Sequence, residues 1–246
     1  MAWGKSPFDR DEMVGSISEF EEVYASRPIR DNAGGMKAPH AFGAWYLARK
    51  LKPRVIIESG VFHGQGTWFL SKGAPEAEFF CLDPNIDQVK IKIDRAKYFN
   101  RDFSRITWDN VDPDNTLVFF DDHQNALDRL MQANFFGFRH VVFEDNYPPR
   151  CGDCFSLKAA LMGQGFPSKD NFWLASDSPW YSEILKSRLD VYAELPPPVV
   201  SEKTRWGEAW TDDAFPTPRP LFTDTIDAPE LFRDEAFGIL GWRIRS

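Results

Sequence analysis

The stretch "VIIESGVFHGQGTWFL", Val55–Leu70, joins a run of branched apolar residues to a glutamate, spaced glycines and a segment with helical character. The apolar run predicts a buried strand that ends near Glu58. Gly60, Gly64 and Gly66 would let the chain turn tightly and bring its backbone close to a ligand. This strand, turn and helix predict a ligand-binding crevice at the carboxyl end of the first strand of an α/β sheet.

Short apolar runs that end in acidic or small residues recur along the chain. With the first, they span residues 54–60, 78–85, 116–122 and 140–146. Stretches with helical spacing lie between them, at residues 66–73, 86–99 and 124–137. This alternation predicts an α/β fold built on a doubly wound, mostly parallel sheet, with helices on both faces and right-handed crossovers.

The chain is acidic, with a formal net charge of -8 and a pI near 5.1. This charge argues against a general nucleic-acid binder, because such proteins need a basic stripe to neutralise phosphates. No stretch reaches the ~18 apolar residues that span a bilayer, and the first residues lack the apolar core of a signal peptide. We therefore expect no membrane span and a cytoplasmic location. Cys81, Cys151 and Cys154 suit a reducing compartment, and the sequence favours ordinary thiols over a metal or redox pair at Cys151 and Cys154.

The glycine spacing after the first strand is GxxxGxG, which differs from the GxGxxG fingerprint of dinucleotide-binding turns. Glu58 would also repel a pyrophosphate at this turn, and it suits a ligand whose nearest group is positively charged. Asp83 follows the second strand, where a carboxylate can accept hydrogen bonds from ribose hydroxyls. The two acids fit a nucleoside with a positive tail and no phosphates, such as S-adenosylmethionine. Both could instead be helix caps or solvated strand ends.

Four segments carry a resemblance to a known family: "VIIESGVFHGQGT", "FFCLDPN", "LVFFDDHQNALDRL" and "HVVFEDN". In this order they resemble the class I S-adenosylmethionine-dependent methyltransferases. More narrowly, they resemble the branch of sugar and macrolide-sugar O-methyltransferases that use a divalent metal. The likeness covers residues 35–162, and it implies a Rossmann-like, mostly parallel sheet of seven strands.

A single methyltransferase domain is therefore expected over residues 1–246. Residues 1–53 would form an N-terminal cap and the first helix, and residues 54–162 the cofactor-binding core. Residues 163–246 are expected to hold a helix near residues 180–189, a strand that ends at a triple proline, a long irregular insertion and a last strand.

The resemblance assigns cofactor binding to the opening turn and to acids at later strand ends. These residues are Glu58, Gly60, Val61, Phe62, His63, Gly64, Gly66, Thr67, Asp83 and Asp121.

Carboxylates also end the later strands, and the resemblance implies that they hold magnesium. The predicted ligands are Asp121, Asp122, Glu144 and Asp145. The branch often has Asp-Gly-Asp-His where this chain has Phe120-Asp121-Asp122-His123, so either Asp121 or Asp122 could be the ligand. Several carboxylates in one place would repel one another unless a cation lies among them, and oxygen ligands suit Mg²⁺ or another hard divalent ion.

His123 is the predicted general base toward an acceptor hydroxyl, and Asp122 or Asp121 could fix its tautomer. Alternatively, His123 opens the following helix and Asp122 caps it. His63 could approach the cofactor or face solvent, whereas His40 and His140 are expected to start a helix and a strand.

Two further regions could contact an acceptor. The loop with Asn32, Gly34, Gly35 and Met36 could fold over the adenosine or the acceptor. Trp180, Trp206 and Trp210 could stack on a sugar ring, although packing within the insertion is favoured. The aromatic C-terminal part could also form a homodimer contact.

We therefore expect an S-adenosylmethionine-dependent O-methyltransferase that acts on a hydroxyl of a sugar or glycan, with Mg²⁺ and a histidine base. The alternatives are an NAD(P)-dependent Rossmann oxidoreductase and a non-catalytic nucleoside-binding domain. A metal-dependent hydroxylase is disfavoured, because a non-haem iron site requires two histidines and only His123 lies among the acids.

Overall fold

A mostly parallel sheet runs through the centre of the computed structural model, which describes residues 8–166, 176–200, 202–204, 207–211, 216–233 and 241–244. The strands are β1 (Val55–Ser59), β2 (Glu78–Leu82), β3 (Ala96–Phe99), β4 (Thr116–Phe120), β5 (His140–Phe143), β6 (Val191–Glu194) and β7 (Gly241–Ile244). They lie in the order β3-β2-β1-β4-β5-β7-β6. β3, β2, β1, β4 and β5 pair in parallel, and β7 runs antiparallel between β5 and β6. The predicted α/β, Rossmann-like fold with a parallel sheet is confirmed.

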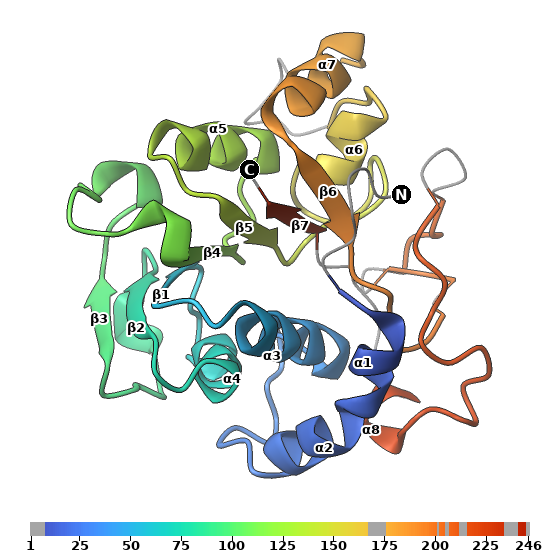
Figure 1. The fold of residues 1–246 in the computed structure, drawn as a ribbon. Helices are drawn as coiled ribbons and strands as arrows, with labels where there is room; N and C mark the ends of the chain where they lie inside the picture. The colour runs from blue at the N-terminus through green and yellow to red at the C-terminus, as the bar shows by residue number, and fades with distance from the viewer. Residues whose placement is uncertain are drawn as a thin grey trace.

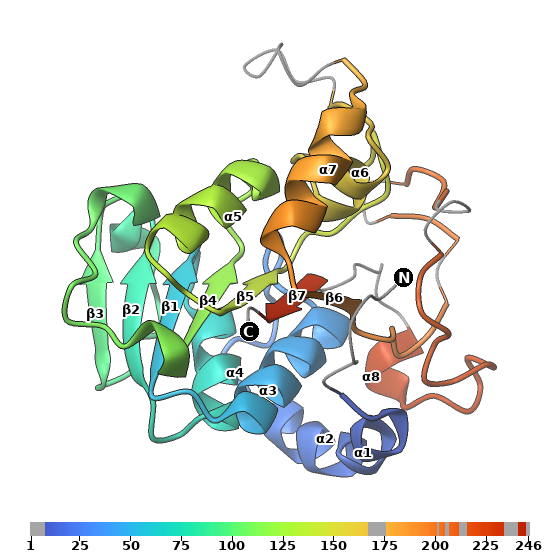
Figure 2. The same ribbon diagram turned by 45° about the horizontal axis from the view of Figure 1, so that its top comes forward.

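Helices cover both faces of this sheet (Figures 1 and 2). On one face lie α1 (Arg10–Gly15), α2 (Ile17–Ala25), α3 (Ala38–Leu51), α4 (Gln65–Gly73) and α8 (Glu230–Arg233). On the other lie α5 (Ala126–Phe135), α6 (Leu157–Leu161) and α7 (Pro179–Arg188). Alternate strand residues enter separate cores, so that Ile56 packs toward α3 and α4 and Ile57 toward α5 and α6. The strands are thus buried on both faces, which explains their continuous apolar runs.

The helix predicted over residues 86–99 is wrong. The chain forms a short 3₁₀ turn, η1 (Ile86–Gln88), and then the edge strand β3, whose Ala96 to Phe99 pair with Phe79 to Leu82 of β2. The sequence Val-Lys-Ile-Lys-Ile before β3 alternates with a period of two, which favours extended chain over helix. Lys90 N and Ile91 N both donate to His63 O at 3.1 Å, so this extended segment is tied to the glycine turn.

The cap of α5 is Asn125, and the alternative that Asp122 caps this helix is wrong. The Asn125 side chain accepts hydrogen bonds from Leu127 N at 3.0 Å and Asp128 N at 3.3 Å. Asp122 lies too early in the chain and pairs instead with the α5 side chain Arg129. Two further 3₁₀ turns, η2 (Phe103–Arg105) and η3 (Pro113–Asn115), lie between β3 and β4.

The C-terminal elements follow the predicted order of helix, strand, insertion and last strand. α7 and β6 lie where they were expected, and β6 leads into the triple proline. After the insertion, β7 enters the sheet between β5 and β6. Cys81, Cys151 and Cys154 are free thiols. Among the described residues, no helix has the length and apolar character needed to cross a membrane.

Candidate functional site

A cavity of about 380 Å³ opens at the carboxyl ends of β1, β2 and β4. Its volume is in the range of small-molecule sites, which is roughly 300–1,000 Å³. The residues that line it are Asn32, Gly34, Gly35, Met36, Gly60, Val61, Phe62, His63, Gln65, Gly66, Asp83, Pro84, Asn85, Gln88, Asp121, Asp122, His123 and Glu144. The structure therefore brings the predicted turn, the strand-end acids and the loop at residues 32–36 to one place.

The opening turn needs glycine at two positions because the backbone of other segments approaches it. A Cβ on Gly60, which has φ 91°, would lie 1.9 Å from Asp121 O. A Cβ on Gly64, which has φ 90° and precedes α4, would lie 2.2 Å from Ile91 O. The turn is thus packed between the end of β4 and the segment before β3.

Asp83 holds the same turn from the end of β2. Its Oδ2 accepts hydrogen bonds from Val61 N at 3.0 Å and Phe62 N at 2.9 Å, and its Oδ1 accepts one from Asn85 N at 2.8 Å. Phe62 has φ 48°, a conformation that non-glycine residues rarely adopt, and these bonds stabilise it. Asp83 therefore shapes the turn in addition to lining the cavity.

Glu58 lies behind the turn and is not one of the residues that line the cavity. It is 1% exposed, and its Oε2 accepts hydrogen bonds from the Thr67 hydroxyl and the Cys81 thiol. Its Oε1 has no hydrogen-bond partner in the described part of the chain and would be 2.8 Å from a Cβ on Gly66. Burial, helped by the charges of Asp121 and Asp83 and opposed by the Thr67 hydrogen bond, raises the pKa of Glu58 well above its ordinary value. A buried carboxylate with an unused oxygen next to Gly66 fits a cationic ligand group at this turn.

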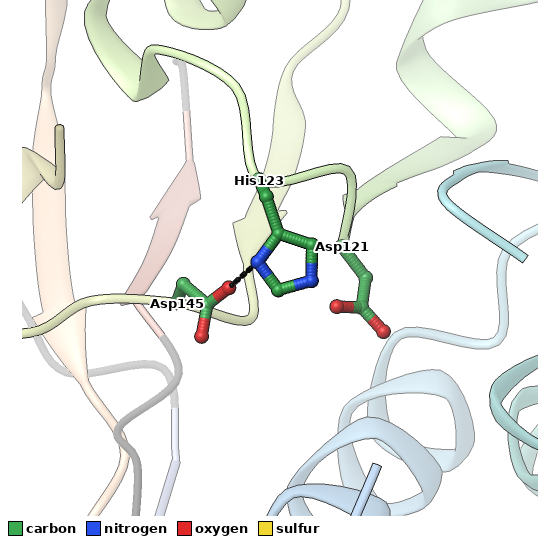
Figure 3. Close-up of side chains that lie close together, drawn as sticks. All are labelled: Asp121, His123 and Asp145. Atoms are coloured by element: carbon green, nitrogen blue, oxygen red, sulfur yellow. Dashed lines mark ion pairs between the residues drawn. The ribbon is translucent and has the colours of Figure 1, made fainter. Parts of the chain in front are cut away.

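Asp121, His123 and Asp145 form a close group beside the cavity (Figure 3). One potential ligand atom from each lies within 4.8 Å of the others. His123 Nδ1 is 2.9 Å from Asp145 Oδ2 and 3.1 Å from Asp153 Oδ1. The hydrogen bonds that the imidazole donates to these two carboxylates, Asp145 first, raise the pKa of His123 to about 11. Burial and the neighbouring charges of Glu144 and Asp145 raise the pKa of Asp121 well above its ordinary value.

Asp122 and Glu144 are each held by a partner outside this group. Asp122 Oδ2 accepts hydrogen bonds from Ser59 Oγ at 2.6 Å and Arg129 Nε at 2.9 Å. Glu144 Oε1 accepts a hydrogen bond from His40 Nδ1, on the first turn of α3. The structure therefore does not gather all of the predicted metal ligands in one group. Asp121 joins the group with His123 and Asp145, whereas Asp122 is paired with the Arg129 guanidinium.

The group of Asp121, His123 and Asp145 fits a divalent cation in its donor atoms, because it offers two carboxylates and one imidazole. The imidazole departs from the all-oxygen set that Mg²⁺ prefers, and it also suits Mn²⁺. Asp145 belongs to a second close group with Asp153 and Cys154. In the described residues, neither group contains the two histidines of a non-haem iron site.

Several residues of the site carry no sequence signal of their own. His40 was expected only to start a helix, yet it is 6% exposed and contacts Glu144, 104 positions along the chain. Arg129 and Asp153 likewise contact partners that are distant in sequence, Asp102 at 27 positions and His123 at 30 positions. His140 is the first residue of β5, as expected.

The tryptophans do not line the cavity where the structure describes them. Trp180 is 71% exposed on α7. Trp210 packs near Tyr147, with ring centroids 6.1 Å apart, and donates a hydrogen bond to Thr217 Oγ1 at 3.0 Å. Trp206 lies outside the described residues.

No family model matches the chain, and no curated protein matches it. Solved structures do resemble it in fold. The O-methyltransferase TomG from Streptomyces achromogenes, involved in tomaymycin synthesis and in complex with SAM, aligns with a TM-score of 0.52 at 13% identity over 100% of this chain and 92% of that one. Cofactor-bound Rv0187 from MTB gives 0.47 at 14% identity, covering 99% of both chains. An O-methyltransferase from Bacillus cereus in complex with SAH gives 0.44 at 11% identity, covering 99% of this chain and 93% of that one.

The likeness to TomG shows that this chain has the α/β Rossmann-like fold of the methyltransferases, with a parallel sheet. At this level of identity the comparison concerns the fold, and the function must be argued from the site.

Proposed function

We propose that this protein is an S-adenosylmethionine-dependent methyltransferase that acts on a hydroxyl group. The observation that carries the proposal is the cavity at the carboxyl ends of β1, β2 and β4, where the glycine turn meets acids from separate strands. Asp83, Asp121, Asp122 and Glu144 line it, and no Lys or Arg does so among the described residues. This charge favours a cationic, phosphate-free cofactor over a dinucleotide with its pyrophosphate.

Two acids support cofactor binding in different ways. Glu58 Oε1 is buried next to Gly66, which has no side chain to separate it from the cavity. When ionised, this oxygen would attract the positively charged tail of the cofactor. Asp83 is already bonded to the turn, and carboxylate oxygens can accept further hydrogen bonds, here from ribose hydroxyls. When bound, S-adenosylmethionine supplies a methyl group on a positively charged sulfur.

Methylation of a hydroxyl forms a C–O bond as the C–S bond breaks, and the hydroxyl proton must leave. The pairing of His123 with Asp145 and Asp153 keeps its imidazole protonated at neutral pH, so that it has no free lone pair to accept this proton. Asp121 lines the same cavity, and the raised pKa of its carboxyl makes it a stronger base than an ordinary aspartate. We therefore propose Asp121 as the proton acceptor in place of His123, and assign Asp122 a positioning role through Ser59 and Arg129.

In a metal-bound form of the site, Asp121, Asp145 and a deprotonated His123 would hold a divalent cation, and Asp121 would then act as a ligand and not as the base. Such an ion would supply positive charge that lowers the pKa of a nearby hydroxyl. The proposed acceptor is a sugar or glycan, because the sequence motifs resemble the sugar-methylating branch and the amide side chains of Asn32, Asn85 and Gln88 can hydrogen-bond hydroxyls.

Transfer of a labelled methyl group tests the proposal. The purified chain would be incubated with methyl-labelled S-adenosylmethionine and panels of free sugars, nucleotide sugars and phenols, each with Mg²⁺, with Mn²⁺ or with a chelator. We expect label on at least one hydroxyl compound and a loss of about 100-fold or more in turnover in Asp121→Asn, since a positioned base contributes about 10²–10⁴-fold. Label on none of them, together with hydride transfer from NAD(P)H, would favour the oxidoreductase alternative.

A further inference from the structure

A second pocket, of about 530 Å³, lies between α4 and the extended segment that precedes β3. It shares no lining residue with the cavity at the carboxyl ends of β1, β2 and β4. Most of its lining is apolar and includes Trp68 of α4, Phe79 of β2, and Ile91 and Ile93 of the extended segment. Phe79 is 1% exposed, whereas Trp68, Ile91 and Ile93 are only partly buried and leave apolar surface for a ligand.

The extended segment that forms one wall of this pocket is held by hydrogen bonds. Ile91 N donates to His63 O at 3.1 Å, and Ile93 N donates to Tyr98 Oη at 3.0 Å. The opposite wall is the helix α4. A ligand would therefore enter a pocket that is already formed, which lowers the entropic cost of binding.

Positive side chains surround the apolar surface, although the whole chain has a formal net charge of -8. Lys72, Lys92 and Arg95 line the pocket, and Asp94 is the only acid in the lining that the structure describes. Arg95 is paired with Glu76, which lies 3.4 Å away. Two lysines and one aspartate remain, which leaves a single positive charge in excess.

Neither lysine forms an ion pair with a carboxylate in the described part of the chain. Lys72 Nζ lies 5.2 Å from the centroid of the Trp68 ring, and Lys92 Nζ lies 5.3 Å from the centroid of the Tyr98 ring. Contacts of this kind are weak at exposed sites. Both ammonium groups can therefore take an anionic partner without breaking an existing ion pair.

We propose that this pocket is a second binding site, which takes a small carboxylate with an apolar body. The apolar body packs on Trp68, Ile91 and Ile93, and the carboxylate pairs with Lys72 and Lys92. Its single negative charge matches the excess positive charge of the lining. The inference goes beyond the proposed methyl transfer and does not depend on it, because the pocket lies outside the cofactor cavity.

The test is an NMR titration of the full ¹⁵N-labelled chain with 4-phenylbutyrate. We expect saturable shifts of the backbone amides of Ser71, Lys92 and Ile93, with a Kd of about 1 mM, as is usual for a ligand of this size. 4-Phenylbutyramide has the same shape without the charge and should bind about 3- to 10-fold more weakly. Acetate has the charge without the apolar body and should give no saturable shift at these amides.

Substitution of the lysines tests the electrostatic part of the inference. Lys72→Gln and Lys92→Gln should each weaken 4-phenylbutyrate binding by about 2- to 5-fold and leave the Kd of the amide unchanged. The double variant should bind the two compounds equally. Lys186→Gln is the matched control, because this exposed lysine lies on α7, on the other face of the sheet, and should keep both wild-type Kd values.

Three results would overturn the inference. The first is the absence of saturable shifts at the amides of the second pocket with 4-phenylbutyrate. The second is equal binding of the carboxylate and its amide by the wild type. The third is a loss in Lys186→Gln as large as that in the two pocket variants. None of these results depends on whether the chain binds S-adenosylmethionine.

Discussion

Glu58 is the residue that we propose to favour a cationic cofactor, although it does not line the cavity. The residue was expected at the mouth of the turn, and the structure places it one layer behind, against Thr67 and Gly66. Because the pKa of Glu58 is raised, its negative charge would act on the cofactor only after the carboxyl group has released its proton, and a buried site would then screen this charge less than water does. Ionising the Glu58 carboxyl group in this buried position costs free energy, which is why its pKa is raised.

We predict that Glu58→Gln flattens the pH dependence of stability. Because the pKa of Glu58 in the folded chain lies above 4.5, the folded state holds this proton after the unfolded state has released it. The wild type should therefore lose free energy of unfolding as pH rises from 4.5 through the raised pKa. Urea denaturation across this window should show a shallower decline in the variant. An identical decline in both proteins would show that Glu58 does not have a raised pKa in the folded chain.

Asp83 offers a second prediction at the residue scale. Asp83→Ala removes the acceptor for Val61 N, Phe62 N and Asn85 N, and each buried N–H left unpaired costs about 1–3 kcal/mol. We expect a lower free energy of unfolding in urea and at least about tenfold weaker binding of S-adenosylhomocysteine by calorimetry, equivalent to about 1.4 kcal/mol. The exposed neighbour Asp87→Ala should change neither quantity. Unchanged affinity in Asp83→Ala would exclude it as a binding residue.

At the scale of elements, the sequence predicts those strands and helices whose position depends on a local pattern of apolar residues or prolines. β1, β2, β4 and β5 carry apolar runs because both of their faces are buried, and α7 and β6 have clear ends in proline-containing segments. β3 was missed because it is an edge strand with mixed burial, and its pairing with β2 depends on tertiary contacts. The wrong cap of α5 has another cause: the helix begins at Ala126, so that its cap is Asn125, and Asp122 lies three residues earlier.

A buried ion pair joins α6 to β6 and to the insertion. Lys158 Nζ lies 2.9 Å from Glu194 Oε2 and 3.2 Å from Thr217 Oγ1, and the side chains of the ion pair are 0% exposed. Asn146, which directly follows Glu144 and Asp145, donates to Glu194 Oε1 at 3.3 Å. The insertion is thereby connected to the acidic end of β5.

We predict that Lys158→Met lowers the free energy of unfolding by about 3–5 kcal/mol, because it leaves the Glu194 carboxylate buried without its cation. Adding Glu194→Gln should recover more than half of the loss, since the amide oxygen can still accept from Tyr192 OH. Urea denaturation of the single and double variants measures both effects. A double variant no more stable than Lys158→Met would show that the charge is not the cause.

At the scale of the whole molecule, the site gathers segments from residue 32 to residue 144 around the carboxyl ends of parallel strands. This common edge made Asp83, Asp121 and Glu144 predictable, because each follows a recognisable strand. His40, Asp153 and Arg129 were not predictable as site residues, because their partners come from other elements. The division of the predicted metal ligands has the same origin: neighbouring acids such as Asp121 and Asp122 point to different partners.

Calorimetry of the purified chain with S-adenosylmethionine, S-adenosylhomocysteine and NAD⁺ tests the central claim most directly. We predict that both adenosyl compounds bind with Kd values of about 1 μM, near -8 kcal/mol, and that NAD⁺ does not bind. Binding of NAD⁺ without binding of either adenosyl compound would contradict the claim that the acidic cavity lined by the glycine turn selects a cationic, phosphate-free nucleoside.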